Sequence, residues 1–184
     1  GSGNGVSISN NNGTSWNLSN NLAFNTVLSL IAEAGNIFAG TNGGGIYLSS
    51  DNGNTWNSVN SGLTSLTIYS LAISGTNIFA GTNDGMFVSG NLGASWLPIN
   101  TGLPSQPVVK SIAINGSDIF IGTWSGIFKS SNNGGQWNSV NVGLTDYVVN
   151  SILLVGSNIF AGTYYSGIFL STNNGGSWNV INNG

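Results

Sequence analysis

The six residues Asn36–Thr41 read NIFAGT, and the same letters return at Asn77–Thr82 and Asn158–Thr163. A fourth copy, DIFIGT, stands at Asp118–Thr123. The copies begin at residues 36, 77, 118 and 158, so they are 41, 41 and 40 residues apart. Self-similarity at such a period predicts an architecture of repeated supersecondary units that pack against one another.

The repeated stretch is apolar on both faces of a strand. Because side chains alternate along a strand, Ile37 and Ala39 lie on one face and Phe38 on the other. A strand that is apolar on both faces must be covered on both, and Gly40 leaves room for a close neighbour. We therefore expect each copy to be an inner strand between two neighbouring sheets.

Each repeat contains four short runs that predict strands. Gly, Asn and Ser bound these runs, and no segment has a convincing helical period. Strand two is the NIFAGT copy, strand three is a run such as GIYLS or GIFKS, and strand four is expected to begin at a tryptophan. Strand one is expected at Val27–Ala32, Tyr69–Ile73, Ser111–Ile114 and Ser151–Val155. The fold class predicted from these runs is all-β.

A second motif, S-x-[DN]-x-G-x-x-W, recurs in register with the first. Its Asp or Asn can close an Asx turn on the backbone, and its Gly can take a positive φ. The tryptophan then places a large apolar ring under the hairpin. The five copies contain Asn11, Gly13 and Trp16; Asp51, Gly53 and Trp56; Asn91, Gly93 and Trp96; Asn132, Gly134 and Trp137; and Asn173, Gly175 and Trp178. A third motif, N-x-G-L, occurs at Asn60–Leu63, Asn100–Leu103 and Asn141–Leu144.

The tryptophan motif resembles the Asp-box, or BNR, repeat of β-propellers, which include sialidases, xyloglucan-cleaving glycosidases, sortilin-type receptors and a photosystem assembly factor. Only the copy at Asp51 has the full consensus, and the other four have Asn at the acidic position. The resemblance implies a β-propeller of four-stranded antiparallel blades with an Asp-box hairpin between strands three and four. The amino-acid pattern of the repeat, N-x-G-L followed by NIFAGT, also resembles that of large exported bacterial repeat proteins. A WD-repeat propeller has a similar period but needs a Gly-His signature, and the chain has no His.

The repeats divide the chain into about 4.5 blades of a single propeller. We expect a half-blade of strands three and four at residues 1–26, followed by blades at 27–62, 63–102, 103–143 and 144–184. The half-blade would lack its two inner strands. We expect the chain to be part of a longer one, because a closed propeller usually has about 4–8 blades and hides its open edges.

Charge and cysteine content exclude several function classes. Charged residues are 4% of the chain, and Lys110 and Lys129 are its only cations. Two cations at a net charge of -3 cannot neutralise a run of phosphates, so nucleic-acid binding is not expected. The chain has no cysteine and no apolar run of about 18 residues, which excludes disulfides and helical membrane insertion. No cofactor and no metal site is expected.

Binding residues are expected on the face opposite the tryptophan motifs, where the loops between strands two and three meet the loops between blades. These loops are the least repeated part of each unit, and variation on a constant scaffold is typical of binding sites. An aromatic platform with amides beside it suits neutral sugars. The candidates are Trp124, Tyr164, Tyr165, Asn83, Asp84, Asp146 and Tyr147. These aromatics could equally plug the mouth of the ring or pack on another chain.

Catalysis within these residues is not expected. A sialidase needs an arginine cluster, and the chain has no Arg. Other glycosidases need two facing carboxylates, and of the five acids only Asp84 and Asp146 are expected on the candidate face. Glu33 and Asp118 are expected in loops between strands one and two. The sequence thus favours a non-catalytic structural or interaction module, extracellular or on a bacterial cell surface. The alternatives are a carbohydrate-binding propeller and part of a glycosidase whose catalytic residues lie elsewhere. Partners would be a glycan, another extracellular protein, further blades or a second copy.

Overall fold

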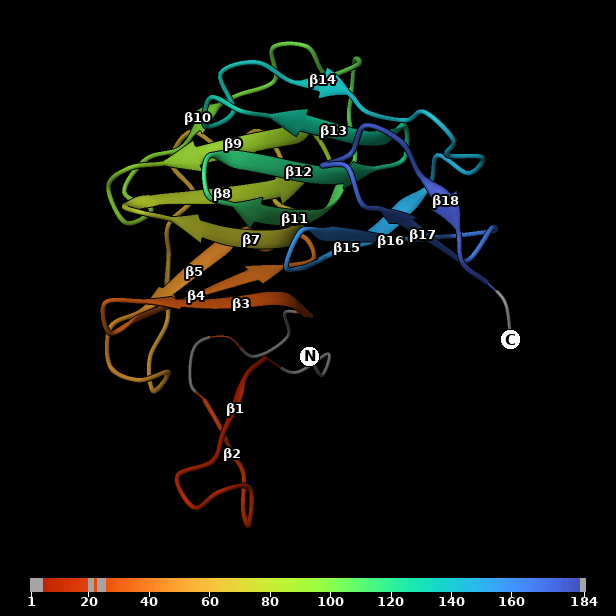
Figure 1. Ribbon diagram of the computed structural model, residues 1–184. Coiled ribbons are helices and arrows are strands. Elements are labelled where there is room, and N and C mark those ends of the chain that lie inside the picture. The colour runs from red at the N-terminus through yellow and green to blue at the C-terminus, as the bar shows by residue number, and fades with distance from the viewer. Residues whose placement is uncertain (1–4, 20–21, 23–25, 183–184) are drawn as a thin grey trace. The chain divides into compact units, whose positions relative to one another are not determined.

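The computed structural model describes residues 5–19, 22 and 26–182, and every regular element among them is a β-strand (Figure 1). The all-β prediction is confirmed. A two-stranded sheet, β1–β2, precedes four sheets of four strands each. The strands are β1 (Ser7–Ile8), β2 (Asn17–Leu18), β3 (Val27–Glu33), β4 (Asn36–Thr41), β5 (Ile46–Ser49), β6 (Asn57–Ser58), β7 (Ile68–Ser74), β8 (Asn77–Thr82), β9 (Gly85–Ser89), β10 (Leu97–Pro98), β11 (Val109–Asn115), β12 (Asp118–Thr123), β13 (Gly126–Ser130), β14 (Asn138–Ser139), β15 (Val149–Val155), β16 (Asn158–Thr163), β17 (Ile168–Ser171) and β18 (Asn179–Val180).

Each four-stranded sheet is a meander in which strands adjacent in sequence are adjacent in space. The registers are nearly identical between sheets: Phe38 pairs with Leu48, and Phe160 pairs with Leu170. Strand one is longer than expected and starts with a register shift, for instance between Val27 and Ser29. Residues 1–4 and 23–25 of the expected half-blade, and residues 183–184, lie outside the described part of the chain.

The expected start of strand four is wrong by one residue, and the strand is shorter than expected. Each such strand begins after the tryptophan and has two residues. The reason is that the backbone N–H of the tryptophan is used elsewhere. The N–H of Trp96 donates to the carbonyl of Ser61, and that of Trp137 donates to the carbonyl of Thr101, so neither joins its own ladder.

Two of the four repeated strands, β8 and β12, are covered on both faces, as expected, whereas β16 is only partly buried. In β8 and β12 the five residues after the first are all buried. The glycine of this motif lies directly against the next sheet: a Cβ on Gly40 would be 2.8 Å from Ile68 Cγ2, and one on Gly122 would be 2.8 Å from Val149 Cγ1. A side chain at these positions would therefore separate the sheets.

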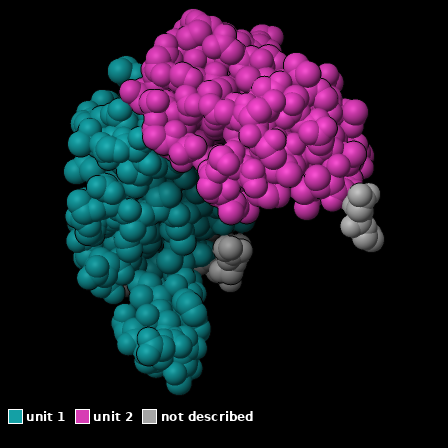
Figure 2. Space-filling view, in the orientation of Figure 1, with its two compact units in different colours: residues 1–80, 88–97 teal, residues 81–87, 98–184 magenta. Residues whose placement is uncertain are grey.

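By internal packing the chain divides into two compact units, residues 1–80 with 88–97 and residues 81–87 with 98–184, which Figure 2 colours separately. The first unit contains β1–β7 and has a buried cluster of Leu22, Val27, Ala39 and Trp56. The second contains β11–β18, with a buried cluster that includes Phe120, Leu144 and Trp178. The blade boundaries expected from the repeat stay a prediction.

The tryptophan loops are closed by a hydrogen-bond pattern that repeats from sheet to sheet. In the loop after β5, the Ser49 hydroxyl donates to Asp51 Oδ1, and the backbone N–H groups of Gly53 and Thr55 donate to Ser49 Oγ and Asp51 Oδ1. Asn91 accepts the equivalent bonds from Ser89 and Ser95 through Oδ1. An amide oxygen thus replaces the carboxylate, because the turn needs only one acceptor at this position.

The tryptophan side chains join each sheet to the one before it. The indole N–H of Trp137 donates to the carbonyl of Ile99 at 2.7 Å, and that of Trp178 donates to the carbonyl of Val140 at 2.7 Å. Trp56, Trp96, Trp137 and Trp178 are all buried. Trp16, which belongs to the first copy, is 64% exposed.

The N-x-G-L motif also has a structural role. Asn60 Oδ1 accepts a hydrogen bond from the backbone N–H of Ile46, and Asn141 Oδ1 accepts one from Ile127, at 2.7 Å in both cases. Each Asn therefore fixes the start of strand three. The glycine of the motif has positive φ and touches the tryptophan backbone of the next repeat, as Gly102 does at Trp137.

Candidate ligand-binding site

The loop between β12 and β13 carries one exposed tryptophan, Trp124. The Thr123 hydroxyl donates to the carbonyl of Gly126 at 2.8 Å and accepts a hydrogen bond from the N–H of Ser125 at 2.9 Å. This bonding closes a tight turn with Gly126 at φ +102°. Trp124 lies at the tip of this turn and is 53% exposed.

The buried carboxylate of Asp146 fixes the corresponding loop between β16 and β17. Asp146 Oδ2 accepts hydrogen bonds from the backbone N–H groups of Tyr165 at 2.6 Å and Ser166 at 3.1 Å. Its Oδ1 accepts one from the N–H of Val148 at 2.9 Å. Burial would raise the pKa of Asp146, but these bonds and one from the Thr163 hydroxyl outweigh it and lower the pKa. The ionised carboxylate therefore holds the backbone of Tyr165 and Ser166, while the N–H of Tyr164 donates to the carbonyl of Val148 at 2.9 Å.

Two polar residues reach the same area from bulges in strand one. The register of β11 against β12 shifts between Val109 and Ser111, and that of β15 against β16 shifts between Val149 and Ser151. The residues at these shifts are Lys110 and Asn150. A bulge turns the side chain of its extra residue away from the regular alternation.

These elements border an open surface hollow of about 390 Å³, which we call the aromatic hollow. Its lining residues are Lys110, Trp124, Val148, Asn150, Tyr164 and Tyr165. The Tyr164 and Tyr165 rings meet edge to face with centroids 4.5 Å apart, and Lys110 Nζ lies 5.9 Å from the centroid of the Trp124 ring. Burial lowers the pKa of Lys110. The site combines exposed aromatic faces with one amide and one ammonium group.

The structure brings together only part of the set expected from sequence. Trp124, Tyr164 and Tyr165 line the aromatic hollow, whereas Asn83, Asp84 and Tyr147 are not among its lining residues. Asn83 and Asp84 form the loop between β8 and β9, where the Asp84 N–H donates to Thr82 Oγ1. Asp146 lies behind the hollow, and its oxygens accept bonds from the loop backbone.

The sequence interpretation missed Lys110, Val148 and Asn150. A signal for two of them was present: the residue before the serine of strand one differs in every repeat, reading Leu28, Tyr69, Lys110 and Asn150. Val148 had no such signal, because it belongs to a loop between sheets.

Two of the other acids, Asp118 and Asp51, have structural contacts. Asp118 was expected in a loop, but it is the first residue of β12. Its Oδ2 lies 2.7 Å from Lys129 Nζ. The hydrogen bond from Lys129 is the main reason why the pKa of Asp118 falls to about 2. Hydrogen bonds from the backbone and side chain of Thr55, and from Ser49, lower the pKa of Asp51. Glu33 ends β3 rather than lying in a loop.

Comparison with protein-family models finds no match, and neither does a search of curated proteins. Solved structures do match. An ancestral GH74 enzyme is 23% identical with a TM-score of 0.74, covering 85% of this chain and 24% of its own. The extracellular domain of a one-component system from B. thetaiotaomicron is 20% identical with a TM-score of 0.81, covering 97% of this chain and 25% of its own.

A third similar structure, the GH74 xyloglucanase from Xanthomonas campestris, is 16% identical with a TM-score of 0.66 and covers 86% of this chain and 30% of its own. The chain thus spans about a quarter of the length of the first two structures. At these identities the likeness shows the fold alone, and it agrees with the repeated antiparallel sheets. The fold of the described residues is that of a partial β-propeller, in which each sheet is a blade.

Proposed function

We propose that the chain is a non-catalytic interaction module of a secreted or cell-surface bacterial protein, and that its aromatic hollow binds a carbohydrate. The observation that carries the proposal is the group of three exposed aromatic rings, Trp124, Tyr164 and Tyr165, around a single hollow. Three such rings at one place are hard to explain by folding alone, because exposing them gives up the free energy of burial.

The chemistry of the hollow favours a sugar. Its volume of about 390 Å³ is in the range of small-molecule sites. The apolar faces of sugar rings pack on aromatic rings, while the amide of Asn150 can both donate to and accept from hydroxyl groups. The Tyr164–Tyr165 loop is held by backbone bonds to Asp146, and the Trp124 loop is held by the bonds of the Thr123 hydroxyl, so little conformational entropy would be lost on binding.

The carboxylates support a role without catalysis. Glycoside hydrolysis by acid–base chemistry needs two carboxyl groups facing each other across the ligand. Asp146 accepts hydrogen bonds from three backbone N–H groups, and Asp118 forms an ion pair with Lys129. Neither group is arranged as a general acid, because each has contacts that lower its pKa.

The extracellular location, the bacterial source and the identity of the tryptophan loops as Asp boxes are parts of the same proposal. The bonds from Ser49 and Thr55 to Asp51 support the Asp-box assignment. One similar structure is an extracellular domain and another is a xyloglucanase, which is compatible with a module outside the cell.

A glycan-binding screen followed by calorimetric titration tests the proposal. We expect a neutral oligosaccharide to bind, and Trp124→Ala to weaken its binding at least tenfold. The matched control is Trp16→Ala, which removes another exposed tryptophan far from the hollow in sequence and should leave the affinity unchanged. If no glycan binds, or if Trp124→Ala binds as tightly as the unchanged chain, carbohydrate binding is wrong.

A second candidate is a glycosidase-type propeller of which these residues are one part. The similarity of the fold to GH74 enzymes favours it. In this case the aromatic hollow would hold part of a polysaccharide, while carboxylates outside these residues would perform hydrolysis. Release of reducing sugar from xyloglucan by a longer form of the protein, but not by these 184 residues, would support this candidate. If the longer form binds a glycan but does not hydrolyse it, the glycosidase candidate is wrong and the non-catalytic interaction module remains.

A further inference from the structure

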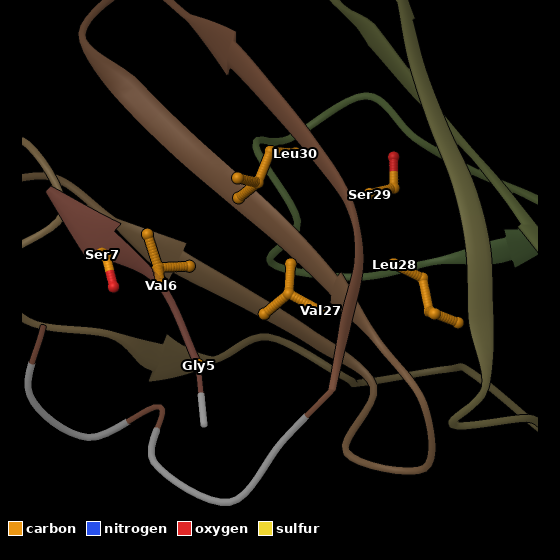
Figure 3. Close-up of a pocket in the computed structure, with 7 residues that line it drawn as sticks. All are labelled: Gly5, Val6, Ser7, Val27, Leu28, Ser29 and Leu30. Atoms are coloured by element: carbon orange, nitrogen blue, oxygen red, sulfur yellow. The ribbon is translucent and has the colours of Figure 1, made fainter. Parts of the chain in front are cut away.

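Two hollows of the first compact unit differ in what they offer a ligand. Figure 3 shows one of about 360 Å³ between the chain at Gly5–Ser7 and the start of β3, and the residues that line it carry no charge. The other, of about 420 Å³, lies between the β3–β4 turn and the tryptophan loop that follows β9. We call it the Glu33 hollow, and its lining residues are Glu33, Ala34, Thr76, Gly90, Asn91 and Leu92. All six belong to the first unit, and they place one carboxylate beside apolar side chains.

Four of the six lining residues differ from the equivalent residues of the other repeats. Glu33 stands where the others have Ser, Asn or Val, and Ala34 stands where they have Gly. Gly90 stands where the other tryptophan loops have Ser, Thr or Asn, and Leu92 stands where they have Asn. One acid and two apolar side chains are therefore added at this single place, while Gly90 leaves a side chain out.

Two of these departures cost free energy in the backbone. Ala34 has φ +48° and Leu92 has φ +54°, a left-handed conformation that glycine and asparagine adopt at lower cost. The equivalents of Ala34 are glycines at φ +58° to +61°, and those of Leu92 are asparagines at φ +53° to +58°. Both residues nevertheless line the same hollow. Strained positions that gather at one place are typical of binding sites.

In the second unit, the equivalent of Leu92 closes the corresponding place. Asn174 Nδ2 donates to Asp118 Oδ2 at 2.9 Å, and Lys129 Nζ lies 2.7 Å from the same oxygen. Lys129 Nζ is also 5.4 Å from the centroid of the Phe120 ring. The chain itself thus shows how a carboxylate at such a place is satisfied, by an ammonium group that also lies over apolar surface.

Glu33 is partly buried at the end of β3, and its own unit has no side chain that could neutralise it. The first unit contains no Lys, Arg or His. Both lysines of the chain belong to the second unit, where Lys129 pairs with Asp118 and Lys110 lines the aromatic hollow. A cation that pairs with Glu33 would therefore come from another molecule, and the net charge of -3 favours the approach of such a molecule.

We propose that the Glu33 hollow binds a lysine side chain of a partner protein. The ammonium group would donate to the Glu33 carboxylate and to the Thr76 hydroxyl oxygen, and the methylene stem would pack on Leu92 and Ala34. An ammonium group fits better than a guanidinium group, because Glu33 and Thr76 supply two acceptor side chains where a guanidinium brings five N–H donors.

The lysine is assigned to a protein rather than to a free amine. One partly solvated ion pair contributes little affinity by itself, so a free amine would be held weakly. A partner protein would also cover the side chain of Leu92, which is 45% exposed, and burial of this apolar surface adds to affinity. A lysine flanked by apolar residues therefore matches both the carboxylate and the surface around it.

A titration followed by nuclear magnetic resonance tests the proposal. The isotope-labelled chain is titrated with a capped pentapeptide that has lysine between two leucines. We expect saturable shifts of the backbone amide signals of Ala34 and Leu92. The matched control peptide has norleucine in place of lysine, which keeps the stem and removes the ammonium group, and it should bind about fivefold more weakly. Equal binding of the two peptides, or no saturable shift at either amide, would overturn the proposal.

Two charge variants separate binding at Glu33 from a general attraction to an acidic chain. Glu33→Gln and Asp51→Asn each remove one negative charge from the first unit. Asp51→Asn should keep its turn, because the other four tryptophan loops have Asn at this position. Glu33→Gln should weaken binding of the lysine peptide about fivefold, whereas Asp51→Asn should leave its affinity unchanged. Equal weakening by the two variants would mean that the attraction is unspecific, and the proposal would be wrong.

A third variant and a free amine test the apolar part of the site. Leu92→Asn removes the apolar wall without an expected loss of stability, and it should weaken binding of the lysine peptide about threefold. Unchanged affinity would contradict the packing of the stem on Leu92. Butylammonium, which has the stem and the charge of lysine without a backbone, should bind more weakly than the peptide, and equal affinity would overturn the assignment to a protein partner. Glycan binding at Trp124 is independent of all these results.

Discussion

Trp124 and Trp137 belong to the same repeat, yet one is 53% exposed and the other 1% exposed. Trp137 comes from a motif with five copies, and its indole donates to the carbonyl of Ile99. Trp124 comes from a loop in which no other repeat has tryptophan, and its ring borders the aromatic hollow. The comparison teaches that repeated positions are used to join the blades, whereas a position that differs between repeats is free to serve binding.

The strongest test of this comparison replaces each tryptophan by alanine. Trp137→Ala should lower the free energy of unfolding by about 3–5 kcal/mol, because it empties a buried site and removes a hydrogen bond between blades. Trp124→Ala should change it by less than about 0.5 kcal/mol, because its ring is largely in solvent. Urea denaturation followed by tryptophan fluorescence measures both. Similar losses for the two variants would show that the exposed tryptophan is also part of the scaffold.

Asp146 is the point at which scaffold and candidate site meet. Asp146→Asn should lower the free energy of unfolding by about 1–3 kcal/mol, because the amide has one acceptor oxygen where the carboxylate has two, and its NH₂ group faces backbone N–H donors. Glycan affinity should fall as well, since Tyr165 would no longer be held by Asp146 Oδ2. The measurements are urea denaturation and calorimetric titration of the same variant. A loss of stability with unchanged affinity would separate Asp146 from the site.

Local sequence signals were sufficient for most of the fold. The apolar alternation in NIFAGT and the Gly and Asn residues around it depend only on neighbouring residues, and they predicted strand two to the residue. The candidate site depends on contacts over longer distances. The partner of Asp146 is 19 residues away at Tyr165, and the bulges that place Lys110 and Asn150 arise from the register between two strands. Neither can be read from a single stretch of sequence.

Acid titration tests the scaffold at the Asp118–Lys129 ion pair. The folded-state pKa of Asp118 is about 2, below its ordinary value of 3.8, so its contribution to stability is present above about pH 4 and is lost as the pH falls toward 2. Asp118→Asn should cost about 1 kcal/mol at pH 7, since the pair is partly solvated. At pH 2 the cost should be at most half as large. Urea denaturation at both pH values measures the difference, and a cost independent of pH would contradict the role of the charge.

The smallest expected effect concerns a repeated position that is occupied by an unfavourable residue. Leu92 has φ +54° in its tryptophan loop, where the other four loops have Asn at φ +53° to +58°. A left-handed conformation costs leucine more than asparagine, and Leu92 is exposed, so little packing would be lost. Leu92→Asn should therefore raise the free energy of unfolding by about 0.5–1 kcal/mol.

The matched reverse change is Asn133→Leu, which should lower the free energy of unfolding by a similar amount, and both can be measured by urea denaturation. If Leu92→Asn were instead destabilising, the leucine would have a role that the turn geometry does not explain. The hollow of about 420 Å³ that it borders with Glu33 and Thr76 would then be the place to look for it. Leu92 would then resemble Trp124. Both positions differ from the equivalent positions of the other repeats, and each would have a role other than joining the blades.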